Sequence, residues 1–482
     1  MKPSSVYRWV RDTRAILLIL FIPALIALSP GISPAMNFQA ESSGRMEISG
    51  SVKASFGMTQ YLDWVDNHSK GDDADLDATR EMAINAAWLV SDRLKAVISF
   101  QIGEGTTGGY FGATDALVGG EEDGNEVVEL DRLYIDYTTE SKVNVKVGSQ
   151  SACLNDLSYG SNIMNEVPPG VSVKAPLTPD VSLEVAWFRI ADLMDDTLGN
   201  TDDQADLLWV KAPYRLGSLS LAPWAAYASI QKDVIDNAPS YMRYAYFNYP
   251  AFFSGANAAM ADPTPTDDVT SYYLGVTMSS APSDDLYIQG SFTYGSMDWE
   301  TAAVDATVAG FFVDFVARYN MGFAKPEVFA IYTSGPDAND DDLDMMPVLI
   351  GGPTYTSSFF GGSRFNDNMF DSYDTTYAAS MWALGFKLKD IRTGPVSHEF
   401  QIMVAGGTAD DSIFQKPNDT LLNEDEGVLE LNFNSQYKIT DNLVFATELG
   451  YMNFSEDKDY NEAVDGEVKD FWKAACALEL SF

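Results

Sequence analysis

The 482-residue chain is poor in histidine, cysteine and positive charge. It has two histidines, two cysteines, and 30 lysine and arginine residues against 70 aspartate and glutamate residues, so its formal net charge is −40. Because a phosphate backbone is bound by a basic surface, this charge argues against a nucleic-acid partner. With 46% hydrophobic and 12% aromatic residues, the chain is nevertheless not disordered in composition.

Outside its first 30 residues the chain has no apolar run long enough for a membrane-spanning helix. At the N-terminus, four basic residues precede the apolar run AILLILFIPALIAL (15–28), and the small residues Ser33 and Ala35 follow it. This order is typical of a secretory signal peptide, and the run is short and interrupted by proline. We expect cleavage after Ala35, so that residues 1–35 are removed and residues 36–482 form the mature protein.

The two cysteines give no disulfide framework. Export would permit a disulfide, but Cys153 lies in a polar, glycine-containing stretch and Cys476 in the last predicted strand. We therefore expect both cysteines to be small, unpaired side chains.

Strict alternation of polar and apolar residues runs through the mature chain. The segments RMEISGSVKASFGM (45–58), KVNVKVGSQ (142–150) and VLELNFNSQYKIT (428–440) all place large apolar residues on one side and charged, amide or hydroxyl residues on the other. A period of two indicates strands that separate two environments. A soluble sandwich faces its apolar side inward, whereas a membrane barrel faces it outward to lipid.

Strand length and connection length favour the membrane barrel. Many segments run for ten residues or more, longer than a typical soluble strand. Eight short connections, including LGS (216–218), DIRTGPV (390–396) and TDN (440–442), alternate with long segments such as 104–127, 231–268 and 335–373, which we expect to be external loops. The sequence thus predicts an all-β fold, a transmembrane antiparallel β-barrel with short periplasmic turns.

The pattern predicts about 18 strands. Sixteen is the alternative, because 170–176 is short and 298–302 would fit a bulge. The predicted strands lie near 45–58, 79–91, 93–103, 128–139, 142–150, 170–176, 180–191, 205–214, 218–230, 269–279, 285–297, 303–319, 325–334, 374–388, 396–407, 427–440, 442–454 and 468–482.

The last strand ends on a bare aromatic residue. Trp472, Leu478, Leu480 and Phe482 share one face, and Trp472 and Phe482 are ten residues apart. At about 3.3 Å per residue and a tilt near 40°, this separation spans roughly 25 Å, the height of the apolar band, so each aromatic ring fits one interfacial girdle. The terminal Phe482 also resembles the signal by which the outer-membrane barrel assembly machinery recognises its substrates.

With its signal peptide, its first strand GRMEISGSVKASFGM, the segment ELDRLYIDY and the final LELSF, the chain resembles the bacterial general porins of the outer membrane. The resemblance is to the homotrimeric porins of sulfate-reducing and related bacteria, and it covers essentially the whole mature chain. It implies a homotrimer in the outer membrane of a Gram-negative bacterium. Lipid and lipopolysaccharide are then the expected surroundings.

The resemblance also implies that the third long loop, SACLNDLSYGSNIMNEVPPG (151–170), folds into the lumen and narrows it. Its polar candidates for the constriction are Asn155, Asp156, Asn162 and Glu166. Acidic residues on this loop and basic residues on the facing wall would together produce an electric field across the pore. Strand parity predicts that Arg132, Lys146 and Lys53 face the lumen.

Motifs for catalysis and for cofactors are weak. GEGTTG (103–108) has the spacing of a dinucleotide-binding loop, but a turn-rich segment follows it in place of a helix. The acidic run GDDADLD (71–77) has the first three ligand offsets of an EF-hand loop and lacks its later glycine and glutamate. It is either a solvated loop face or a loose divalent site near lipopolysaccharide phosphates. His68 and His398 fall on opposite predicted rims, which argues against a barrel lipase. We expect no enzyme, no cofactor and no dedicated metal site.

The sequence therefore predicts a porin, a passive diffusion channel for small hydrophilic solutes and ions. Acidic external loops raise the local cation concentration, which favours a weak cation preference. One alternative is a substrate-specific channel, for example for a sugar that contacts the aromatic segment YMRYAYFNYPAFF (241–253). A plugged structural or adhesive surface barrel is another.

Overall fold

The structure is a computed structural model of the chain, and it describes residues 44–60, 75–103, 128–154, 159–161, 163–192, 204–232, 234, 267–300, 305–335, 344–349, 355–358, 380–410, 423–455 and 470–482. The expected signal peptide 1–35, residues 71–74 of the acidic run 71–77 and the aromatic segment 241–253 lie outside these residues. Within the described part of the chain, no helix is long and apolar enough to cross a membrane.

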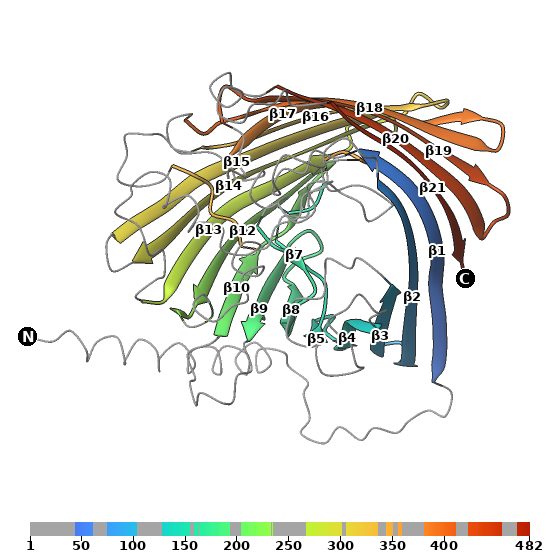
Figure 1. Cartoon of the computed structure of the whole chain (residues 1–482). Coiled ribbons are helices and arrows are strands. Elements are labelled where there is room, and N and C mark those ends of the chain that lie inside the picture. The colour runs from blue at the N-terminus through green and yellow to red at the C-terminus, as the bar shows by residue number, and fades with distance from the viewer. Residues whose placement is uncertain are drawn as a thin grey trace, which may run out of the picture.

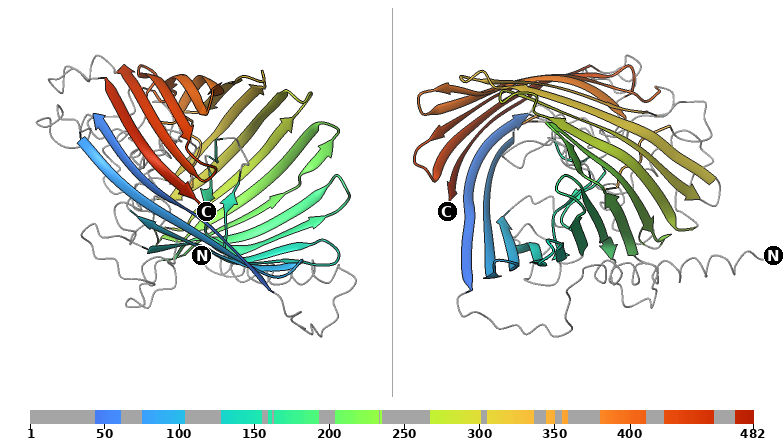
Figure 2. Two further views of the ribbon diagram at one scale, coloured as in Figure 1. Left: turned by 90° about the vertical axis from the view of Figure 1, so that its right-hand side faces the viewer. Right: turned by 180° about the vertical axis from the view of Figure 1, so that it is seen from behind.

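Antiparallel strands form one continuous sheet that closes on itself (Figures 1 and 2). The strands of this sheet are β1 (Arg45–Gln60), β2 (Asp75–Ser91), β3 (Leu94–Gly103), β4 (Val128–Thr138), β5 (Asn144–Ser149), β8 (Pro169–Pro176), β9 (Ser182–Asp192), β10 (Gln204–Lys211), β11 (Tyr214–Leu216), β12 (Leu219–Ile230), β13 (Val269–Ser280), β14 (Leu286–Glu300), β15 (Asp305–Tyr319), β16 (Lys325–Thr333), β17 (Met381–Thr393), β18 (Val396–Gly407), β19 (Gly427–Lys438), β20 (Leu443–Ser455) and β21 (Phe471–Ser481).

These nineteen segments make eighteen barrel strands. β10 and β11 both pair with β12 and follow one another along it, separated by Ala212 and Pro213. Proline has no N–H to donate to a ladder, which explains the interruption. The prediction of an 18-stranded transmembrane β-barrel is confirmed, and the sixteen-stranded alternative is wrong.

The two ends of the chain close the barrel. β1 pairs with β21 from Ser51 opposite Ser481 to Gln60 opposite Trp472. Beyond this ladder the backbones of Gly50 and Phe482 exchange two hydrogen bonds of 2.9 and 3.0 Å. Figure 1 shows the blue β1 beside the dark red β21. Closure leaves no unpaired edge between the first and last strands. An open edge in lipid would leave backbone N–H and C=O groups without hydrogen-bond partners, at a high cost in free energy.

Burial is inverted relative to a soluble protein. On β14, Phe292 and Tyr294 are exposed on the outside, whereas Ser291 and Thr293 between them are buried on the inside. On β21, the outward Leu478 and Leu480 are exposed and the inward-facing Lys473 is almost fully buried. Large apolar side chains on the outer surface and hydroxyl and charged groups within are the arrangement of a barrel in lipid.

The turn predicted at 390–396 is wrong in part. β17 continues to Thr393, and the chain turns at Gly394 and Pro395. A register shift between Leu388 and Ile391 accommodates an irregularity at which Asp390 has a φ of 56°. Such a bulge lets the strand bend without ending, which alternation alone does not reveal.

Cys153 and Cys476 are both described, and neither forms a disulfide, as expected.

Candidate pore constriction

The segment between β5 and β8 lies inside the barrel. It contains a two-residue hairpin, β6 (Ala152–Cys153) with β7 (Asn165–Glu166), in which Ala152 pairs with Glu166. At its start, the Lys211 ammonium of β10 donates to the carbonyl oxygen of Cys153 at 2.5 Å. A polar side chain of the wall thus holds the backbone of this inward segment.

The inward face of β9 to β12 is apolar, and the inward segment packs on it. Phe188, Leu207, Trp209 and Trp224 point inward and are at most 5% exposed. They belong to one buried cluster with side chains of the segment, namely Leu154, Tyr159, Ile163 and Met164, and this cluster continues onto β13 to β20. The expectation of a polar lumen is therefore wrong for these strands, because both faces of each strand are apolar here and alternation could not tell them apart.

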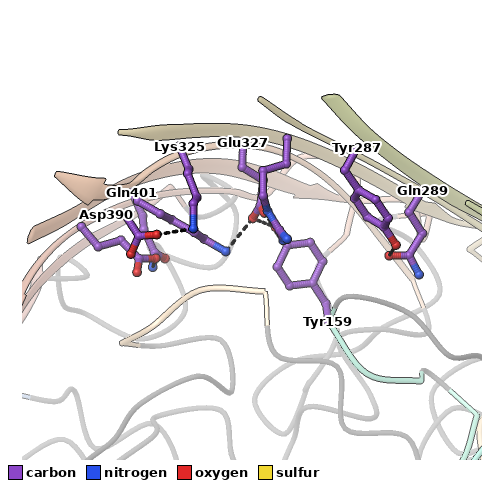
Figure 3. A network of polar contacts seen from close by, with 10 residues as sticks. Tyr159, Tyr287, Gln289, Lys325, Glu327, Asp390 and Gln401 are labelled. Atoms are coloured by element: carbon purple, nitrogen blue, oxygen red, sulfur yellow. Dashed lines mark hydrogen bonds and ion pairs between the residues drawn. The ribbon is translucent and has the colours of Figure 1, made fainter. Parts of the chain in front are cut away.

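The middle of the inward segment contacts the opposite wall through Tyr159 (Figure 3). Its hydroxyl donates to Glu327 Oε1 on β16 at 2.5 Å. Its ring lies 5.1 Å from that of Phe329 on β16, and the Lys387 ammonium of β17 lies 4.2 Å from its centre. Around the ring of strands, β16 is eight strands from β5 in one direction and ten in the other, so the segment crosses the lumen.

Glu327 is a fully buried carboxylate that several donors share. Lys389 lies 2.8 Å from Oε1, and the Arg318 guanidinium pairs with Oε2, its Nε at 2.6 Å. With the Tyr159 hydroxyl, both carboxylate oxygens are occupied. Charge-assisted hydrogen bonds of this kind are stronger than neutral ones, and two cations offset the cost of burying the charge.

A glycine makes room for this contact. A Cβ at position 385 on β17 would lie 2.1 Å from the Phe329 ring, so the ring lies flat over Gly385 only because that residue has no side chain. This packing places the Phe329 ring against that of Tyr159, with the two ring planes tilted by 58°.

Residues 344–349 and 355–358, between β16 and β17, also lie inside, although 335–373 was expected to be an external loop. Thr356 donates to Glu430 Oε2 at 2.8 Å, and the backbone N–H of Ser357 donates to Gln401 Oε1 at 3.2 Å. Tyr355 lies 6.0 Å, ring to ring, from Tyr159. The two inward segments therefore meet inside the barrel, and no local sequence pattern predicts that the second one folds inward.

The wall formed by β1 to β5 is different because its inward side chains reach water. Lys53 pairs with Glu81 at 2.5 Å, and Lys95 pairs with Asp136 at 3.2 Å. The Lys95 side chain is 40% exposed against 11% for Asp136, and Arg132 is 43% exposed against 27% for its partner Asp131. In these last two pairs the cation is the more accessible member.

The predicted wall residues face inward, in keeping with their parity. On β4 the neighbours Leu133 and Ile135 are exposed on the outside, which puts Arg132 on the inner side. Lys146 on β5 lies over the ring of Tyr134 at 5.7 Å, and Lys53 is opposite Glu81 in the β1–β2 ladder.

Of the predicted loop residues, the structure describes Glu166 and not Asn155, Asp156 or Asn162. Burial disfavours the charged carboxylate of Glu166 and raises its pKa to about 8, and the negative charge of Asp131 adds to the shift. Glu166 is thus within electrostatic reach of the wall that carries Arg132.

His398, the histidine that the structure describes, lies on the outer face of β18. Its Nδ1 is 2.8 Å from the Ser435 hydroxyl of β19, and its ring stacks on that of Phe433 at 5.6 Å. The imidazole of His398 and the hydroxyl of Ser435 thus form a hydrogen bond with each other near the periplasmic rim of the wall.

No protein-family model and no curated protein matches this sequence. Solved structures do match the fold. OccAB3 of Acinetobacter baumannii aligns with a TM-score of 0.51 over 91% of this chain and 99% of its own, at 10% identity. OccK2 (OpdF) of Pseudomonas aeruginosa, solved in complex with glucuronate, aligns with a TM-score of 0.51 over 91% and 98%, at 12% identity. The fold is that of an outer-membrane porin. OccK9 (OpdG) of Pseudomonas aeruginosa gives a TM-score of 0.50 at 10% identity, over 91% and 98% of the two chains.

Proposed function

We propose that this protein is an outer-membrane porin that lets small hydrophilic solutes and ions diffuse passively across the membrane. The observation that supports this most directly is a closed wall with exposed apolar residues outside and water-accessible charged residues inside, on β1 to β5. A barrel that only anchored a surface structure would gain nothing from an accessible charged inner wall.

In this proposal, solutes pass along the wall of β1 to β5. The buried apolar cluster, which extends over β9 to β20 and includes the two inward segments, fills the other side of the lumen. The constriction then lies between segment 151–170 and the facing wall, where Arg132 contributes a positive charge and Glu166 an opposite charge only above its pKa of about 8. Asn155, Asp156 and Asn162 remain candidates for the same constriction.

Single-channel recording in planar bilayers tests the proposal. Purified, detergent-folded protein should produce ohmic conductance steps. Heat-unfolded protein from the same preparation is the matched control. Folded protein that inserts without producing steps would favour a plugged structural or adhesive barrel instead.

A second candidate is a channel specific for small anionic solutes. Lys95 and Arg132 reach further into water than their acidic partners, which favours anions locally although the chain as a whole is strongly acidic. The glucuronate complex of OccK2 is an example of a carboxylate bound to this fold. Glucuronate that blocks the conductance at a concentration where glucose does not would favour this candidate over a general porin.

The remaining expectations belong to the same proposal. Residues 1–35 direct export, Phe482 is read by the barrel assembly machinery, and the mature chain forms a homotrimer surrounded by lipid and lipopolysaccharide in the outer membrane. The resemblance to the porins of sulfate-reducing and related bacteria supports the trimer, and a molecular mass measured in detergent tests it.

A further inference from the structure

The contact between Tyr159 and Glu327 joins parts of the chain that are 168 residues apart. One partner lies on the inward segment and the other on a barrel strand that is held in the wall by its ladders with β15 and β17. The wall is therefore fixed by backbone hydrogen bonds, whereas the middle of the segment depends on side-chain contacts for its position.

We propose that Tyr159 is the positioning residue of the constriction, and that its hydrogen bond to Glu327 is a latch that keeps the inward segment across the lumen. This inference rests on the channel function proposed above. It adds a role for a residue that strand parity and motif spacing could not identify.

The chemistry of the contact suits a latch. Glu327 is held by Arg318 and Lys389, so its carboxylate is fixed in position and aimed at the Tyr159 hydroxyl. Burial and the negative charge of Glu327 raise the pKa of Tyr159 well above its usual range, so the phenol keeps the proton that it donates. The Glu327 carboxylate is therefore in position to accept this hydrogen bond whether or not Tyr159 is bound to it.

The latch also determines where solutes pass. While Tyr159 occupies Glu327, the inward segment separates the filled side of the lumen from the accessible wall of β1 to β5. Release of the latch would free the middle of the segment from β16 and widen the passage. The base of the segment would remain held by Lys211 and by the buried cluster around Ile163 and Met164.

The change Tyr159→Phe removes the hydroxyl and keeps the ring packed against Phe329 and Lys387. Loss of one hydrogen bond to a charged group should shift the ratio of latched to released segment by about 10- to 100-fold. We expect the wild-type protein to show one dominant conductance level and Tyr159→Phe to add a second, larger level.

Tyr287→Phe is the matched control. Tyr287 also faces inward on this wall, but its hydroxyl donates to the neutral Gln289 at 3.1 Å (Figure 3). We expect this variant to keep the wild-type conductance. Heat-modifiable electrophoretic mobility should be the same for all three proteins, which separates a change in the lumen from a failure of the barrel to fold.

Glu327→Gln supplies the reciprocal test, because it weakens the same contact from the wall side. It should produce the larger level as well, and the double variant with Tyr159→Phe should add nothing further if both act through one contact. A conducting wild type with an unchanged Tyr159→Phe would overturn the latch and leave the channel intact. A wild-type protein that inserts into the bilayer without producing any conductance would instead overturn the proposed channel function.

Discussion

Ala86 and Ala87 are identical neighbours on β2 that face opposite sides of the barrel wall. Ala86 is opposite Ile48 of β1, which is 59% exposed on the outer surface, whereas Ala87 has the inward parity. Replacing each of them by arginine introduces the same side chain at almost the same height, in lipid in one case and in the aqueous lumen in the other.

The structure gives the depth of Ala86 in the membrane. It lies five residues from Ser91 at the periplasmic end of β2, which at about 3.3 Å per residue and a tilt near 40° is roughly 13 Å of a band about 25 Å high. This is close to the midplane, where a lipid-facing arginine costs about 2–4 kcal/mol. A penalty of that size lowers the ratio of folded to unfolded protein by about 30- to 700-fold.

Urea titration of the barrel in phospholipid vesicles, followed by tryptophan fluorescence, measures this difference. We expect Ala86→Arg to lower the free energy of unfolding by about 2–4 kcal/mol, and Ala87→Arg to change it much less while altering the conductance. Equal losses for the two variants, or a larger loss for Ala87→Arg, would refute the orientation of the wall and with it the membrane barrel.

Three further outcomes follow from the lumen and the closing strand. Lys95→Gln should shift reversal potentials towards cation selectivity and Asp136→Asn towards anion selectivity, because the two side chains form one wall pair; shifts of the same sign would contradict this pairing. Glu166, with a pKa of about 8, is mostly neutral at pH 7 and charged at pH 9, so cation selectivity should rise over that range and stop rising in Glu166→Gln; an unchanged pH profile in the variant would exclude Glu166 as the source. Phe482→Ala, which removes the ring that lies over Gly50, should reduce the amount of folded barrel in the outer membrane, measured by surface proteolysis of cells, and wild-type amounts would argue against Phe482 as an assembly signal.

Alternation was enough to predict the outer wall on strands that have one polar and one apolar face. Leu478, Leu480 and Phe482 were expected on one face from spacing alone, and the structure exposes all three. The same rule predicts that Arg132, Lys146 and Lys53 face the lumen, and their role in the constriction stays a prediction. The rule works because every second side chain of a strand points the same way, so a local pattern fixes the environment of each residue.

The rule failed where both faces of a strand are apolar. On β9, Phe188 is buried inside and Trp187 lies outside, and nothing in their order reveals which of the two faces lipid. The apolar side of the lumen became evident only once the inward segment was seen packed on it. Irregularities such as the bulge at Asp390 escaped prediction for a similar reason, since they depend on pairing with a neighbouring strand.

The sequence by itself therefore determined the wall: a closed barrel of about eighteen strands with an apolar outside, because these properties follow from the composition and period of short segments. Only the tertiary structure decided which segments fold into the lumen and narrow it. Whether a loop folds inward depends on partners far away in the chain, as with Tyr159 and Glu327 or Thr356 and Glu430. No local pattern records such a pair, because each residue acquires its partner only when the barrel closes around both.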